Sequence, residues 1–153
     1  MATTAAQQID ANYRTINANE SLLLESTWTY VTATTGATGA HTLFTVTGNV
    51  LVTVFGIVDT NLTGAATLEV GIVGNTAGLL AQTADATTLD DGEIYVDNAS
   101  ATIEALPSPF ILNDGTDIIQ TIGTTAVTAG VIDFYCLWRP LSAGANITVT
   151  TPA

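Results

Sequence analysis

The sequence predicts an all-β protein, an antiparallel β-sandwich of jelly-roll type with an extended N-terminal arm. Short runs rich in Val, Ile, Thr, Phe and Tyr recur along the chain, separated by clusters of Gly, Asn, Asp and Pro. No segment has the regular apolar spacing of an amphipathic helix, and no repeat of fixed period is present. Roughly eight or more short strands with such turns are typical of a jelly-roll sandwich, with immunoglobulin-like topology as the second possibility.

The longest strand-forming run is residues 41–58, HTLFTVTGNVLVTVFGIV. Gly48-Asn49 is a two-residue turn signal in its middle, so the run is predicted to be a hairpin with Thr47 opposite Val50. Pairing outward groups Phe44 and Val46 with Leu51 and Phe55 on one face, and leaves both faces substantially apolar. Since a hairpin with one wet face should alternate, we expect a second sheet on one face and a neighbouring subunit on the other. The predicted oligomer interface consists of Leu43, Val50, Val52 and Val54.

The other strands are predicted from alternation and from the turn residues that border them. They are residues 27–33, 66–73, 78–83 (a short strand or a turn of helix), 93–97, 101–106, 110–112, 117–122, 131–139 and 145–150. Asn113-Asp114-Gly115 predicts a second hairpin between residues 110–112 and 117–122. In residues 131–139 the alternation places Ile132, Phe134, Cys136 and Trp138 on one side.

Residues 1–26 are predicted to be an arm that precedes a sandwich domain of residues 27–153. The apolar residues of the arm are too loosely spaced for a confident amphipathic helix. A segment with so little core of its own gains order from contacts with another subunit. The arm residues expected to make such contacts are Ile9, Tyr13, Arg14 and Ile16.

Composition excludes several classes of partner. The chain has no lysine, and its two cations, Arg14 and Arg139, stand against fourteen carboxylates, for a net charge of −12. Such a chain is repelled by nucleic acid and by anionic lipid. No apolar run approaches the roughly 18 to 20 residues that span a bilayer, and the first residues lack the pattern of a secretory signal. We therefore expect synthesis in a cytosol. The single cysteine, Cys136, is predicted to be a buried, inert thiol.

Carboxylates gather in residues 85–97, where several oxygen side chains resemble hard ligands for Ca²⁺. They are Asp90, Asp91, Glu93, Asp97 and Asn98. The spacing of a twelve-residue calcium loop is absent, and Asp91-Gly92 is first of all a turn sequence. Asn113, Asp114 and Asp117 form a weaker group of the same kind. The prediction is turn chemistry, with no metal and no cofactor.

Acidic side chains on predicted strands are formally eligible as a catalytic carboxylate pair. They are Glu69, Glu93, Glu104 and Asp133, and nothing in their spacing singles out two of them. His41 is the only histidine, and the chain contains no G-x-S-x-G nucleophile motif. The sequence therefore predicts a protein that is not an enzyme.

Two stretches, residues 131–144 (VIDFYCLWRPLSAG) and 46–58 (VTGNVLVTVFGIV), resemble segments of small structural proteins of tailed bacteriophages. In general character residues 41–144 are similar to the capsid decoration, or cement, proteins. The resemblance implies a β-rich, often trimeric protein without catalytic residues. It implies a virion protein on the capsid exterior that is made in the host cytoplasm and stabilises the shell by bridging subunits. The implied partners are the major capsid protein and further copies of the chain. The arm lies outside the resemblance, and we expect its residues Ile9, Tyr13, Arg14 and Ile16 to contact the capsid.

An alternative is a phage tail or fibre head, or another carbohydrate-binding sandwich used for host attachment. Such a module should expose a cluster of aromatic side chains beside polar turns. The candidates are Trp28, Tyr30, Tyr95 and Trp138, most of which are predicted to be buried.

Overall fold

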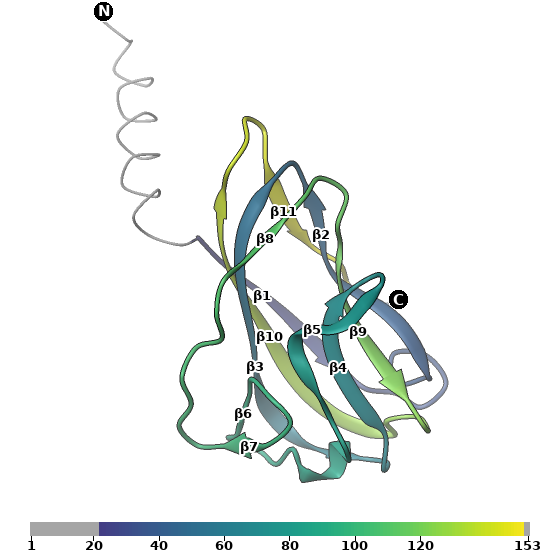
Figure 1. Cartoon of the computed structure of the whole chain (residues 1–153). Coiled ribbons are helices and arrows are strands. Elements are labelled where there is room, and N and C mark those ends of the chain that lie inside the picture. The colour runs from purple at the N-terminus through teal and green to yellow at the C-terminus, as the bar shows by residue number, and fades with distance from the viewer. Residues whose placement is uncertain (1–21, 152–153) are drawn as a thin grey trace, which may run out of the picture.

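The computed structural model describes residues 22–151, which form an all-β sandwich of eleven strands and one short 3₁₀ turn (Figure 1). The strands are β1 (Leu22–Thr29), β2 (Gly39–Thr47), β3 (Val50–Thr63), β4 (Thr67–Ile72), β5 (Asn75–Thr83), β6 (Ile94–Tyr95), β7 (Ser100–Ala101), β8 (Phe110–Leu112), β9 (Ile118–Gly123), β10 (Ala129–Pro140) and β11 (Asn146–Val149). The 3₁₀ turn η1 is Ala86–Thr88. The residues before 22 and after 151 lie outside this description.

Two antiparallel sheets pack face to face. Sheet A has the order β1, β10, β3, β6, β7, with β8 also paired to β3, and sheet B has the order β11, β2, β9, β4, β5. The pairs are nested along the chain: β1 with β10, β2 with β9, β3 with β8, and β4 with β5. A ribbon of nested pairs that alternate between two sheets is a jelly roll. The predicted all-β antiparallel sandwich is confirmed, while residues 1–21 of the predicted arm lie outside the described residues.

The hairpin predicted at Gly48 and Asn49 is wrong, although the turn is present. Gly48 has a φ of 70°, which suits glycine. The strands on either side of it do not pair, because β2 lies in sheet B between β11 and β9 while β3 lies in sheet A beside β10 and β8. With both edges of each strand occupied, the turn carries the chain from one sheet to the other.

This crossing changes which side chains share a face. Phe44 and Val46 point into the core together with the inward residues of β3, rather than with Leu51 and Phe55. The predicted interface residues are also part of this core, with exposed fractions between 0% and 2%: Leu43, Val50, Val52 and Val54. They are covered by the chain's own second sheet, so they do not form an interface with another subunit.

The second predicted hairpin, around Asn113, Asp114 and Gly115, is wrong for the same reason. It joins β8 in sheet A to β9 in sheet B. The two crossing turns lie together, since the amide of Gly48 donates to Asp114 Oδ1 at 2.6 Å and the amide of Asp114 donates to Asn49 Oδ1 at 3.2 Å. A true two-residue hairpin occurs between β4 and β5, where Ile72 pairs with Asn75.

The observed strand ends differ most from the predicted ones where apolar and polar residues alternate weakly in the sequence. The first strand was predicted from residue 27 but begins at Leu22, so residues 22–26 of the predicted arm pair with β10. β6 and β7 are only two residues each, and the predicted strand at 101–106 is mostly loop. The prediction for β10 is confirmed, because its inward residues Ile132, Phe134 and Cys136 are fully buried.

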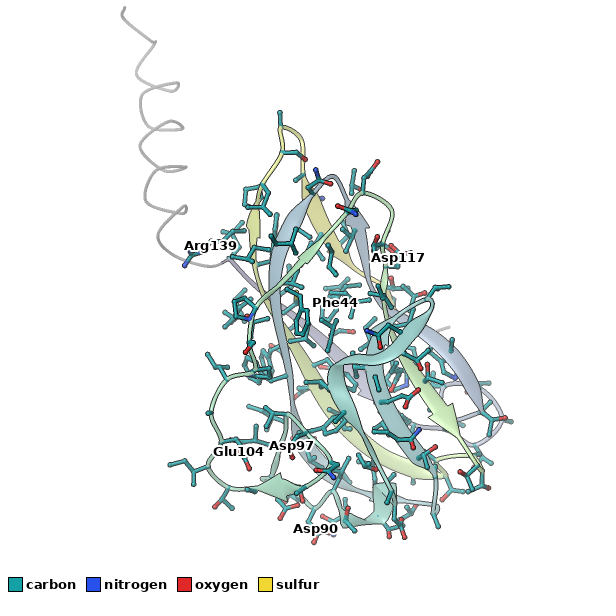
Figure 2. All side chains as sticks on the ribbon, viewed as in Figure 1. Phe44, Asp90, Asp97, Glu104, Asp117 and Arg139 are labelled. Atoms are coloured by element: carbon teal, nitrogen blue, oxygen red, sulfur yellow. The ribbon has the colours of Figure 1, made fainter. Side chains whose placement is uncertain are left out.

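The core lies between the two sheets, with Phe44 near its middle (Figure 2). Burying each large apolar side chain contributes about 1.5 to 3 kcal/mol. Two buried tyrosines bring polar groups into this space and satisfy them: Tyr30 Oη donates to Gln120 Oε1 at 2.8 Å, and Tyr95 Oη donates to the carbonyl oxygen of Leu68 at 2.8 Å. Desolvation by burial raises the pKa of both phenols, which are therefore fixed donors.

Candidate functional site

The acidic stretch that follows β5 uses its carboxylates to build turns. Asp85 caps η1 by accepting hydrogen bonds from the amide and the hydroxyl of Thr87. Glu93 Oε2 accepts from the amide of Asp90 and from the Ser100 hydroxyl, and Asp97 Oδ1 accepts from the amide of Ala99. Hydrogen bonds from the Thr87 side chain and backbone lower the pKa of Asp85, and those from Ser100 and Asp90 lower that of Glu93.

These carboxylates do not converge on a common point. Within residues 22–151 no group of three or more His, Cys, Asp or Glu side chains is arranged to hold a metal ion. The amide of Asp91 donates to Asn61 Oδ1 at 2.7 Å, which ties this turn to the end of β3. Asp114 and Asp117 accept from the amides of Gly48 and Val46, so the second acidic group also serves local structure.

The carboxylates considered as a catalytic pair are dispersed. Glu69 lies on β4, where Gln82 Nε2 donates to its Oε2 at 2.7 Å. Glu104 is exposed in the loop after β7, while Asp133 is on β10. Figure 2 shows Glu104 and Asp97 toward one end of the sandwich and Asp117 toward the other. The structure brings no two of the predicted catalytic carboxylates together as hydrogen-bonded partners.

The contacts of His41 and the burial of Cys136 are those of structural residues. The ring of His41 lies edge-on to Trp28 with centroids 5.6 Å apart, and its Nε2 is 2.8 Å from the carbonyl oxygen of Ala37. Cys136 is buried, and desolvation raises its thiol pKa to about 12. A thiol in this state is a poor nucleophile at neutral pH, which agrees with the predicted inert residue.

The outer side of sheet A is the first of two unusual surfaces, and we call it the sheet A face. It comprises the outward residues of β1, β10 and β3, in cross-strand rows: Leu23, Leu137 and Thr53; Glu25, Tyr135 and Phe55; Thr27, Asp133 and Ile57. The rings of Phe55 and Tyr135 stack with centroids 5.2 Å apart. By contrast, the exposed residues of β2 and β11 in sheet B include three threonines, Thr45, Thr47 and Thr148.

Charge on the sheet A face is negative around Tyr135. Burial raises the pKa of the Tyr135 phenol, and the carboxylates of Glu25, Asp133 and Asp59 raise it further. Asp133 Oδ1 is itself buried, and no donor within residues 22–151 reaches it. This carboxylate oxygen is therefore placed to accept a hydrogen bond from outside the described part of the chain.

The second surface, which we call the β8 border, is the segment that follows β7 and ends in β8, the strand that pairs with β3 on the side away from β10. Its exposed apolar residues are Ile103 (84% exposed), Leu106 (60%), Phe110 (40%) and Ile111 (69%). Pro107 and Pro109 keep most of the segment out of the sheet, because proline lacks the amide that a strand ladder needs. Between Phe110 and the β4–β5 hairpin lies a small cleft, also lined by Leu79 and Leu112.

The β8 border was not predicted as a surface. Its signal is present in the sequence, since four large apolar residues flank two prolines, but their pattern predicts strands at residues 101–106 and 110–112. The arm residues Ile9, Tyr13, Arg14 and Ile16 lie outside the described residues. No helix within residues 22–151 has the length and apolarity to cross a membrane.

Comparison with known proteins gives no match: no protein-family model, no curated protein and no solved structure is significantly similar to the chain.

Proposed function

We propose that this chain is a structural virion protein that binds the outer surface of an icosahedral phage capsid and stabilises the shell by bridging its subunits. The observation that carries the proposal is the β8 border, where large apolar side chains remain in water on a folded domain. Large exposed apolar residues gathered on one segment of a folded domain suggest a protein interaction site. Its partner in the proposal is the major capsid protein.

The charge of the chain supports an outward position. With fourteen carboxylates and two cations, it would be repelled by packaged DNA. The β8 border itself contains a single charged residue, Glu104, between its apolar residues. A largely apolar border on an acidic domain favours contact with protein over contact with nucleic acid.

The jelly-roll fold and the chemistry of the surfaces described above are consistent with a protein that binds a partner. Jelly rolls occur in viral capsid proteins and in lectins, so the fold alone leaves both classes open. The four aromatics considered for carbohydrate binding are all buried, with exposed fractions of 6% or less: Trp28, Tyr30, Tyr95 and Trp138. This burial favours the capsid over a sugar as the partner.

The test is binding to empty shells of the phage that encodes the chain, prepared without this protein. Wild-type protein should sediment with the shells at saturating stoichiometry and raise their resistance to heat. Ile111→Asp and Leu106→Asp should each weaken binding by roughly tenfold or more, since a carboxylate would be buried without a partner. The matched control is Val31→Asp, which alters an exposed residue that follows β1.

Sedimentation of both border variants at wild-type level would contradict the β8 border as the docking site. Failure of wild-type protein to bind shells, or shells equally heat-resistant with and without bound protein, would contradict the capsid function. Selective retention on a glycan array would instead support the carbohydrate-binding alternative.

A further inference from the structure

The sheet A face contains a buried carboxylate oxygen that receives no hydrogen bond from residues 22–151. Three carboxylates, Glu25, Asp59 and Asp133, surround the Tyr135 phenol, and Asp133 Oδ1 is buried without a donor. Apolar side chains lie beside this acidic centre, with Leu23 and Leu137 in the row next to Tyr135 and Ile57 opposite Asp133. A suitable occupant therefore brings one cation together with apolar side chains.

A second sandwich docked face to face is a poor occupant, because it would oppose one set of these carboxylates to another. Arg139, the cation beside Leu51 on the same side of sheet A, already has a partner of its own. The chain has one cation outside its described residues, Arg14. Ile9, Tyr13 and Ile16 lie within five residues of it in the sequence. The segment of residues 1–21 thus carries both the cation and the apolar side chains that a suitable occupant brings.

The position of Leu22 indicates which copy the segment reaches. β1 is an edge strand of sheet A, so the chain enters the fold at the side of the molecule. To lie over the chain's own sheet A face, the residues before Leu22, TINANES, would have to reverse direction, because β1 runs from Leu22 toward Glu25 and Thr27. Extended, such a linker spans about 25 Å, and all of residues 1–21 about 70 Å. A sheet of four or five strands is only about 20 Å wide.

We propose that residues 1–21 of one copy lie across the sheet A face of a neighbouring copy, with Arg14 paired to the Asp133 and Glu25 carboxylates. The apolar residues of the segment cover the rows that contain Leu137 and Phe55. Copies linked in this way form a closed ring if each donates its segment to the next. This inference goes beyond the proposed function, since it concerns only copies of this chain and holds whether or not a capsid is the final partner.

Crosslinking of full-length protein in the absence of capsids tests the proposal. Asn12→Cys is placed in one tagged chain and Thr53→Cys in a second, differently tagged chain, and the mixture is treated with a short bismaleimide. Native Cys136 does not interfere, because its thiol is buried and protonated. The expected product is a covalent dimer that carries both tags. Adding Arg14→Gln to the Asn12→Cys chain should lower its yield by roughly fivefold, while Arg14→Lys should retain most of it.

The matched control replaces Thr53→Cys with Thr148→Cys, an exposed position on sheet B, and should give no dimer. A monomeric crosslink seen only when both cysteines are in one chain would overturn the proposal in favour of the chain's own segment. Absence of any crosslink, or a yield unaffected by Arg14→Gln, would overturn it as well. None of these outcomes depends on shell binding, so the capsid function and this contact can fail separately.

Discussion

The amide of Gly48 donates a hydrogen bond of 2.6 Å to Asp114 Oδ1 and so joins two turns that are far apart in the sequence. Each turn carries the chain from one sheet to the other. The amide of Asn49 also donates to Ser142 Oγ at 2.9 Å, which adds the loop between β10 and β11. This end of the sandwich is therefore closed by contacts between loops.

Replacing Gly48 with Ala should destabilise the fold by more than the same change at Gly115. The two glycines have nearly the same φ, 70° and 72°. A Cβ at Gly48 would lie 2.8 Å from Ala145 Cα, whereas a Cβ at Gly115 would meet nothing within 4 Å. Urea unfolding should show a loss of about 1 kcal/mol for Gly115→Ala and roughly 1 to 3 kcal/mol more for Gly48→Ala. Equal losses would contradict the tight packing of the crossing turn.

Tyr30→Phe should lower the free energy of unfolding by about 1 to 3 kcal/mol, because Gln120 Oε1 would be buried without its donor. Tyr135→Phe is the control, since that ring lies on the sheet A face and is only partly buried; its effect should stay within about 0.5 kcal/mol. Chemical denaturation of both variants provides the measurement. A neutral Tyr30→Phe would show that the buried hydrogen bond contributes little.

Ser100→Ala should raise the pKa of Glu93, because the Ser100 hydroxyl is the main cause of its lowering. A carboxyl with a lowered folded-state pKa stabilises the protein above its unfolded pKa of about 4.3 and loses that contribution as pH falls through the folded value. The variant should therefore lose less stability than wild type on acidification below about pH 4. Carboxyl NMR titration measures the shift, with Asp85 as an internal reference that should not move.

Cys136 should resist thiol reagents in the folded protein. Burial raises its pKa to about 12, so at pH 8 roughly one thiol in ten thousand is ionised, and the side chain is also inaccessible. Reaction with a chromogenic disulfide should follow global unfolding and become fast in denaturant. Labelling within minutes in native buffer would show that β10 opens locally.

Much of the fold could be predicted from local sequence, because alternation and turn residues act over a few positions. The inward set Ile132, Phe134 and Cys136 follows from the period of two in β10. Which strand pairs with which could not be predicted this way. Gly48-Asn49 permits a hairpin, but hydrogen bonding of β3 to β10 and β8, and of β2 to β9 and β11, decides the pairing.

The candidate surfaces were predicted less well, for a related reason. An apolar residue in a strand has the same local pattern whether it faces the core or the outside. Val52 and Phe55 were both expected on apolar faces, and only the position of the second sheet shows that Val52 is internal. The sequence did indicate that the run of residues 41–58 carries apolar side chains on both faces, and in its β3 half Phe55, stacked on Tyr135, lies on the outer side of sheet A.

The nested pairing of strands has a consequence for biosynthesis. β1 emerges from the ribosome first, but Leu22 has its partner Trp138 in β10, near the other end of the described chain. The pairs β4 with β5 and β6 with β7 are local and can close early, whereas the long apolar strand β3 lacks its main partner until β10 is made. Folds with such distant pairings form slowly, and their unpaired strands are prone to aggregate. Slow translation or low temperature should therefore raise the yield of folded protein less than a chaperone that shields β3 until the last strands are made.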